Sequence, residues 1–121
     1  MKHYLLFAIL LCSFFNSVVS ANGTVIYVVR HGQTDWNKTN RLQGRSDIPL
    51  NDQGRKEAKR AGKILKSKSF AACYSSPMSR AMETASLLIL SRDLPILIDE
   101  RLLERNMGSW EGRIKDEYLI T

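Results

Sequence analysis

Three side chains of this 121-residue sequence are of the types needed to bind an oxyanion and attack it. His31 directly follows an apolar run and stands next to Arg30, while Arg80 lies much further along the chain. A neutral imidazole nitrogen can attack phosphorus and form a covalent phosphohistidine. A guanidinium is a planar fork that binds phosphate oxygens through paired hydrogen bonds. This combination indicates chemistry on a phosphate group.

Other residues would complete such a site. Gly32 has no Cβ, which lets the backbone approach an anion closely, and Asn37 can donate a hydrogen bond. Glu104, within LLERNMGSW, is a candidate acid that would protonate a leaving alkoxide. Taken singly, these residues have ordinary interpretations: the arginines can form ion pairs, and Glu104 can pair with Arg101 or Arg105 at the surface. Only their combination indicates a site.

Apolar strand-like runs and helical patterns alternate along the chain. Residues 24–30 (TVIYVVR) are β-branched or apolar on both faces, as expected of a strand buried in a parallel sheet. We also predict strands over 69–75 and 95–99, a loop over 31–50, and helices over 51–67, capped by Asn51, and over 76–90, capped by Ser76. Since ligands bind beyond the carboxyl ends of parallel strands, His31, Arg80 and Glu104 should lie together.

The order of these elements predicts an α/β fold with three layers, in which a mostly parallel sheet is flanked by helices. Residues 113–121 have the pattern of a further helix at its beginning. Three strands and two full helices make a thin domain. We therefore expect a fold that is incomplete at its C-terminus.

Residues 1–21 have the composition of a secretory signal peptide. Lys2 precedes the apolar run 4–15, and small residues follow, with candidate cleavage after Ser20 or Ala21. We predict an exported protein, periplasmic or secreted, whose domain spans residues 22–121 and has no stable membrane insertion after cleavage. Two alternatives stay open: a membrane anchor formed by residues 4–21, which are marginal in length, and a buried core helix.

Composition argues against several other classes. Basic residues concentrate in 55–68, where charges alternate with an apolar stripe as on a solvated helix face, so we expect no nucleic-acid partner. After signal cleavage Cys73 would be the remaining cysteine, and its apolar run FAACY predicts a buried, inert thiol. One histidine and one cysteine would not make a structural zinc site, so no metal is expected.

Four motifs in this order resemble the histidine phosphatase superfamily, the phosphoglycerate mutase-like proteins. They are RHGQTDWN (30–37), RLQGRSDIPLNDQGRKEAKRAG (41–62), SSPMSRAMETA (75–85) and LLERNMGSWEG (102–112). The resemblance runs from about residue 24 to residue 112. It implies transfer of a phosphoryl group from a small phosphorylated substrate to a histidine, with no metal and no cofactor.

The resemblance also implies a role for each matching residue. The nucleophile would be His31 and the proton donor Glu104. The phosphate-binding residues would be Arg30, Asn37 and Arg80, and the substrate-binding residues Gln43 and Gly44.

The motifs leave the reaction itself open. Water as acceptor gives a phosphatase, and a second hydroxyl gives a mutase; the GSWEG sequence and the predicted export favour the phosphatase. The family has a second catalytic histidine near its C-terminus, but the two histidines here are His3 and His31, and neither matches it. A non-catalytic domain that binds phosphorylated ligands is therefore a further alternative. The sequence carries no indication of the oligomeric state.

Overall fold

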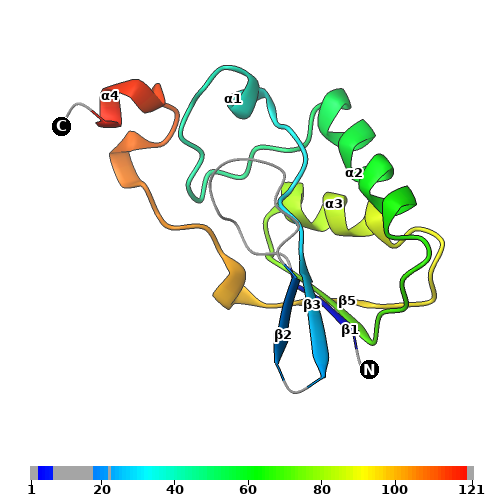
Figure 1. Cartoon of the computed structure of the whole chain (residues 1–121). Helices are drawn as coiled ribbons and strands as arrows, with labels where there is room; N and C mark the ends of the chain where they lie inside the picture. The colour runs from blue at the N-terminus through cyan, green and yellow to red at the C-terminus, as the bar shows by residue number, and fades with distance from the viewer. Residues whose placement is uncertain (1–2, 7–17, 22, 120–121) are drawn as a thin grey trace.

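The computed structural model describes residues 3–6, 18–21 and 23–119 (Figure 1). Its core is a five-stranded sheet in the order β2-β3-β1-β4-β5. The strands are β1 (His3–Leu6), β2 (Val18–Ala21), β3 (Thr24–Val28), β4 (Ala72–Ser75) and β5 (Ile96–Ile98). All neighbouring strands are parallel except β2, which is antiparallel to β3. The predicted α/β class with a mostly parallel sheet is confirmed.

The centre of the sheet is formed by a segment that the sequence analysis placed in the signal peptide. β1 pairs in parallel with β3 on one side and with β4 on the other. Leu6 is in register with both Val28 and Tyr74, so the carboxyl ends of all three strands lie at one level. The structure of the whole chain does not test cleavage, and the signal peptide stays a prediction. No helix among the described residues is long and apolar enough to span a bilayer.

α2 (Asp52–Ile64) follows the first strand-to-helix loop and begins where the sequence predicted. The side chain of Asn51 accepts a hydrogen bond from the Gly54 amide at 2.9 Å, which satisfies one of the free N–H groups of the first turn. Ala58 is buried on the inner face, whereas the basic residues face outward.

β3 differs from expectation, because all five of its residues are half-buried instead of fully buried.

α3 (Ser79–Leu88) begins three residues later than predicted, and the predicted cap is wrong. The hydroxyl of Ser76 accepts only a long bond of 3.4 Å from the Met78 amide. The carboxylate of Asp47, from the loop before α2, instead accepts from the Ser79 amide at 2.8 Å. A negative charge at this position also interacts favourably with the helix dipole. Asp47, which is distant in sequence, thus caps α3 in place of a local side chain.

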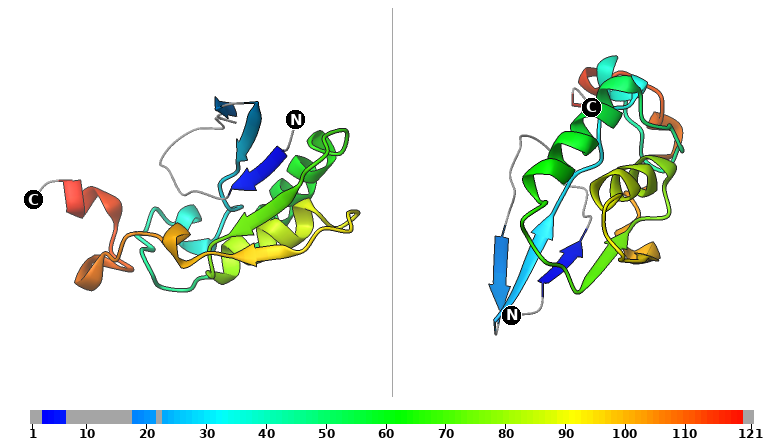
Figure 2. Two further views of the ribbon diagram at one scale, coloured as in Figure 1. Left: turned by 90° about the horizontal axis from the view of Figure 1, so that it is seen from below. Right: turned by 90° about the vertical axis from the view of Figure 1, so that its right-hand side faces the viewer.

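The two long helices lie side by side on one face of the sheet (Figure 2). The crossovers from β3 to β4 and from β4 to β5 run in the same direction, and right-handed crossovers then place both helices on the same side. An ion pair from Arg55 to Glu83, 2.6 Å long, joins α2 to α3. Of the three expected layers, the described residues supply the sheet and one layer of helices.

The apolar core lies between α3, the end of α2 and the sheet. Its buried residues are Leu65, Cys73, Ala85, Leu88 and Ile89. Cys73 is fully buried, and burial raises the pKa of its thiol to about 11. The prediction of a buried thiol is confirmed, and its raised pKa is what is expected of an unreactive one.

The remaining elements are short and lie beyond the carboxyl ends of the strands (Figure 1). They are α1 (Asp35–Lys38), two 3₁₀ turns, η1 (Glu100–Leu102) and η2 (Gly108–Trp110), and α4 (Lys115–Leu119). α1 lies inside the stretch predicted as loop. Its capping box joins Thr34 and Asn37 reciprocally, each side chain accepting from the backbone of the other.

Candidate active site

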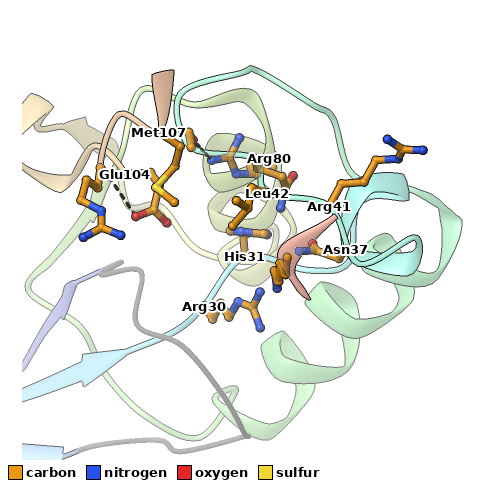
Figure 3. Close-up of a pocket in the computed structure, with 12 residues that line it drawn as sticks. Arg30, His31, Asn37, Arg41, Leu42, Arg80, Glu104 and Met107 are labelled. Carbon is orange, nitrogen blue, oxygen red and sulfur yellow. Dashed lines mark hydrogen bonds between the residues drawn. The ribbon is translucent and has the colours of Figure 1, made fainter. Parts of the chain in front are cut away.

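A pocket of about 340 Å³ opens at the carboxyl ends of the strands (Figure 3). Every residue to which the family resemblance assigned a role lines it, namely Arg30, His31, Asn37, Gln43, Gly44, Arg80 and Glu104, whereas Gly32 does not. They come from segments far apart in the sequence, as expected where parallel strands end together. The volume is that of a pocket for a small molecule.

His31 is oriented as a neutral nucleophile. Its Nδ1 lies 2.7 Å from the carbonyl oxygen of Gly32, which can only accept, so Nδ1 carries a proton and Nε2 has a free lone pair. Burial lowers the pKa of His31 to about 4; the hydrogen bond to Gly32 opposes this shift, and the charges of Arg80 and Arg30 add to it. At neutral pH the ring is therefore uncharged.

Buried contacts hold the loop that carries His31 and Gly32 against α2 and α3. The amide of Gly32 donates to Thr84 Oγ1 at 3.1 Å, and the Thr84 hydroxyl donates to the Arg80 carbonyl at 2.7 Å. A Cβ on Gly32 would come within 2.3 Å of the Gly54 carbonyl oxygen at the start of α2. The glycine is therefore needed for close packing of the loop on α2, in addition to any approach of an anion.

Arg80 forms the buried wall of the pocket, with 1% of its surface exposed. Its two terminal nitrogens donate to the carbonyls of Ser46 and Gly44, both at 2.9 Å. Among the buried side-chain nitrogens and oxygens of the described residues, Arg80 Nε alone has no partner. A buried donor in this situation normally meets a ligand or water. Burial lowers the pKa of Arg80, yet a guanidinium keeps its charge.

Arg30 is the exposed counterpart of Arg80 at the same pocket. Its side chain is solvent-accessible and forms no hydrogen bond or ion pair with the described residues. The two guanidiniums repel each other, and this repulsion also acts to lower the pKa of Arg80. Two positive charges at one pocket, neither in an ion pair with a described residue, favour binding of an anion with two charges.

A polar chain fixes the two amides of the pocket. The Thr34 hydroxyl donates to Gln43 Oε1 at 2.7 Å, and the Thr34 amide donates to Asn37 Oδ1 at 3.0 Å. Since both amide oxygens accept from Thr34, the NH₂ groups of Asn37 and Gln43 are the ends available to a ligand. The two side chains therefore add hydrogen-bond donors to a pocket that is already positive.

Glu104 lies on the opposite side of the pocket from the helices and directs its carboxylate toward the histidine (Figure 3). Its Oε1 accepts a hydrogen bond from the Arg105 amide at 2.9 Å. The alternative ion pair with Arg101 is not formed, because that guanidinium pairs with Asp99. Glu104 and Arg80 are near enough for the carboxylate to stabilise the guanidinium charge.

The sequence analysis missed several residues of the pocket and its support. The lining also includes Arg41, Leu42, Arg105, Met107 and Lys115. Arg105 is adjacent to Glu104, and Arg41 stands two residues before Gln43 in the same motif, so their positions in the sequence could have identified them. Thr84 and Lys115 carried no comparable signal, since they reach the site through the fold.

An α/β fold with a neutral buried histidine and a positive pocket at the ends of parallel strands defines a protein suited to bind phosphate-like anions. A family comparison agrees with this class. The chain belongs to the histidine phosphatase superfamily (branch 1), whose model matches residues 26–119.

Individual relatives include both mutases and phosphatases. A 2,3-bisphosphoglycerate-dependent phosphoglycerate mutase of Bifidobacterium longum is 40% identical over 97 residues, covering 76% of this chain and 39% of the mutase. Bacillus stearothermophilus YhfR has 46% identity, a TM-score of 0.70, and coverage of 76% and 46%. A phosphoserine phosphatase of Entamoeba histolytica, solved in complex with 3-phosphoglyceric acid, has 34% identity, a TM-score of 0.68, and coverage of 74% and 44%. The chain thus spans less than half the length of these relatives.

Proposed function

We propose that the pocket hydrolyses small phosphomonoesters through a phosphohistidine at His31. The observation that carries this proposal is the geometry of the imidazole: Nδ1 is bound to a carbonyl, which leaves the Nε2 lone pair beside the two arginines. Arg30, Arg80 and Asn37 bind the phosphoryl oxygens and stabilise the charge of the transition state.

The reaction consists of two displacements at phosphorus. Nε2 of His31 forms a bond to phosphorus while the bond to the ester oxygen breaks, and the carboxylic acid of Glu104 gives its proton to the leaving alkoxide. Water then attacks the phosphohistidine, its proton passes to the Glu104 carboxylate, and inorganic phosphate leaves. A hydroxyl of a second substrate in place of water would give a phosphotransferase, the reaction class named for the mutase relatives.

The pocket favours esters that carry a second anionic group. Arg105 and Lys115 also line it, beyond the arginines that would hold the phosphate. Gln43 and Gly44 stand on the same rim and bind the organic part of the substrate. Phosphorylated hydroxy acids and amino acids have this charge pattern, and they include the ligands named for the structural relatives.

Binding without turnover is the second candidate. His31 is the one imidazole among the described residues that line the pocket. A site with both arginines and a single histidine would still bind a phosphate dianion, whereas loss of one positioned donor lowers rates by about 10² to 10³.

Hydrolysis of an aryl phosphate by the full chain and by His31→Ala separates these candidates. We expect phosphate release from the wild type, none above background from the variant, and a phosphohistidine trapped after rapid acid-free quenching. Phosphate binding without any turnover supports the second candidate. Equal turnover by both proteins would contradict the mechanism, and alcohol phosphorylation in place of phosphate release would identify a transferase.

We also propose export directed by residues 1–21. Cleavage after Ser20 or Ala21 would remove β1 and all or nearly all of β2. The residues that would direct export are therefore the same residues that form these two strands of the sheet in the uncleaved chain. Intact mass of the protein recovered outside the cytoplasm tests this: a chain that starts at residue 21 or 22 supports cleavage. A full-length chain in the membrane fraction supports the anchor formed by residues 4–21, and a full-length soluble chain contradicts both.

A further inference from the structure

We infer that Glu111 is a positioning residue that holds Arg80 in its phosphate-binding orientation through the loop 43–46. The inference rests on the proposed phosphate pocket. Glu111 is not among the residues that line the pocket. Its carboxylate instead joins two segments that carry functional groups.

Arg80 depends on this loop because the hydrogen bonds of its guanidinium go to two carbonyl oxygens of the loop. Both acceptors, the carbonyls of Gly44 and Ser46, belong to the loop. Arg80 has no ion pair within the described part of the chain that would fix it independently. Any displacement of the loop therefore moves the guanidinium and its unpartnered Nε.

The carboxylate of Glu111 is the anchor of the loop. Its Oε1 accepts from the amides of Arg45 at 2.8 Å and Met107 at 3.2 Å, and its Oε2 accepts from the Ser46 hydroxyl. Burial alone would raise the pKa of Glu111, but the hydrogen bonds from Ser46, Arg45 and Met107 lower it below its ordinary value. The group is therefore charged near neutral pH and accepts bonds on both oxygens.

Gly44 makes room for this anchor. Its φ of +51° lies in the left-handed region, and a Cβ there would come within 2.3 Å of Glu111 Oε1. The same anchor connects to the proposed proton donor, because Arg45 Nε donates to the Glu104 carbonyl at 3.1 Å. Glu111 thus couples the phosphate-binding arginine to the segment that carries Glu104.

Two substitutions distinguish positioning from a general structural role. Glu111→Ala removes both carboxylate oxygens and with them all three hydrogen bonds. In Glu111→Gln the amide oxygen accepts from the two backbone amides, and its NH₂ donates to a rotated Ser46 hydroxyl. Glu100→Ala removes an exposed carboxylate of η1, at the start of the segment that carries Glu104, and serves as the control.

The experiment measures inorganic phosphate binding by calorimetry and the Arg80 Nε–H resonance by ¹⁵N NMR, with the resonance assigned from its loss in Arg80→Lys. We expect Glu111→Ala to shift or broaden the resonance and to weaken phosphate binding about tenfold or more. Glu111→Gln should restore both within about twofold, as should the control. An unchanged resonance and affinity in Glu111→Ala, or failure of the glutamine to rescue, would overturn the inference.

These readouts separate this inference from the proposed function. If the wild type binds no phosphate, the proposed pocket is wrong, whereas the Arg80 resonance still reports whether Glu111 controls the guanidinium. If Glu111→Ala does not fold, Ser46→Ala decides, because it removes one bond of the anchor and keeps the Ser46 carbonyl. A shifted Arg80 resonance in Ser46→Ala supports the inference, and an unchanged one contradicts it.

Discussion

The two sides of the pocket are built in different ways. On one side, His31 is buried just after the carboxyl end of β3, and Arg80 is buried in the first turn of α3. The Thr84 hydroxyl links the backbone of Gly32 to that of Arg80. On the other side, Glu104 lies between two 3₁₀ turns, and polar contacts to the loop 43–46 hold its segment. The buried side has the groups that bind and attack phosphate, and the opposite side has the proposed acid.

This difference predicts that binding and proton transfer can be separated by mutation. Groups on rigid, buried elements are held in place by the core, so that removing them affects both stability and affinity. Groups on an irregular segment depend on a few hydrogen bonds, and their loss should alter the rate with little effect on the fold. The following predictions test this contrast.

The largest effect is expected at Arg80. Arg80→Ala leaves the buried carbonyl of Gly44 without a donor and the carbonyl of Ser46 with only the Ile48 amide, which should lower the free energy of unfolding by about 3 kcal/mol and abolish measurable phosphate binding. Arg30→Ala removes an exposed group and should weaken phosphate binding with a stability change within about 0.5 kcal/mol. Urea unfolding and calorimetry on both variants measure the contrast, and equal losses of stability would contradict it.

The second prediction concerns the free energy of unfolding at acid pH, which depends on the buried His31. Burial lowers the pKa of His31 from its ordinary value of 6.5 to about 4 in the folded chain. The unfolded chain therefore binds a proton that the folded chain does not, so stability is complete above pH 6.5 and falls as the pH drops toward 4. A difference of this size corresponds to about 3 kcal/mol. His31→Gln should lack this part of the pH dependence in urea unfolding, and identical profiles for both proteins would show that the ring is not buried as a neutral group.

The third prediction concerns the opposite side. Glu104→Gln keeps the size of the side chain but cannot donate a carboxylic proton, so turnover of an alkyl phosphate should fall by about a hundredfold. An aryl phosphate has a better leaving group and should lose much less, while phosphate affinity and stability stay unchanged. Steady-state rates with both esters provide the test. An equal loss for both would place the effect in the hydrolysis of the phosphohistidine, where Glu104 takes the proton of water, and would contradict its role as the acid that protonates the leaving group.

Local sequence patterns were sufficient to predict that the candidate site residues lie at one pocket. Arg30 and His31 end a β-branched run, and the topology of parallel strands then brings Arg80 and Glu104 to the same edge. The supporting groups could not be predicted in this way. Thr84 and Glu111 act through hydrogen bonds to residues 52 and 66 positions away, respectively, and no local pattern indicates such bonds.

Two structural elements were missed for related reasons. α1 depends on the reciprocal cap between Thr34 and Asn37 in a stretch rich in turn-forming residues. β1 lies in an apolar segment whose composition also fits a signal peptide, and periodicity alone does not distinguish the two. The N-cap of α3 was assigned to Ser76 because local capping is the common case, whereas Asp47 provides the contact from a distant loop.

The smallest effect is expected at the rim of the irregular side. Lys115 lines the pocket at the start of α4, where its amide donates to the Asn40 carbonyl, and its proposed role is to attract a second anionic group of the substrate. An exposed charge contact of this kind contributes about 1 kcal/mol, so Lys115→Ala should raise the KM for phosphoserine about fivefold. The KM for an aryl phosphate with an uncharged aryl group should stay the same, because that ester has no second anionic group for the lysine to bind.

Lys63→Ala, on the exposed face of α2, is the matched control for net charge. If both lysine variants raise the KM for phosphoserine equally, the effect comes from the overall positive charge of the protein. If only Lys115→Ala does so, the irregular side of the pocket selects the substrate while the buried side binds its phosphate. Added salt should reduce the difference, since screening weakens an exposed ion contact more than the buried contacts of Arg80.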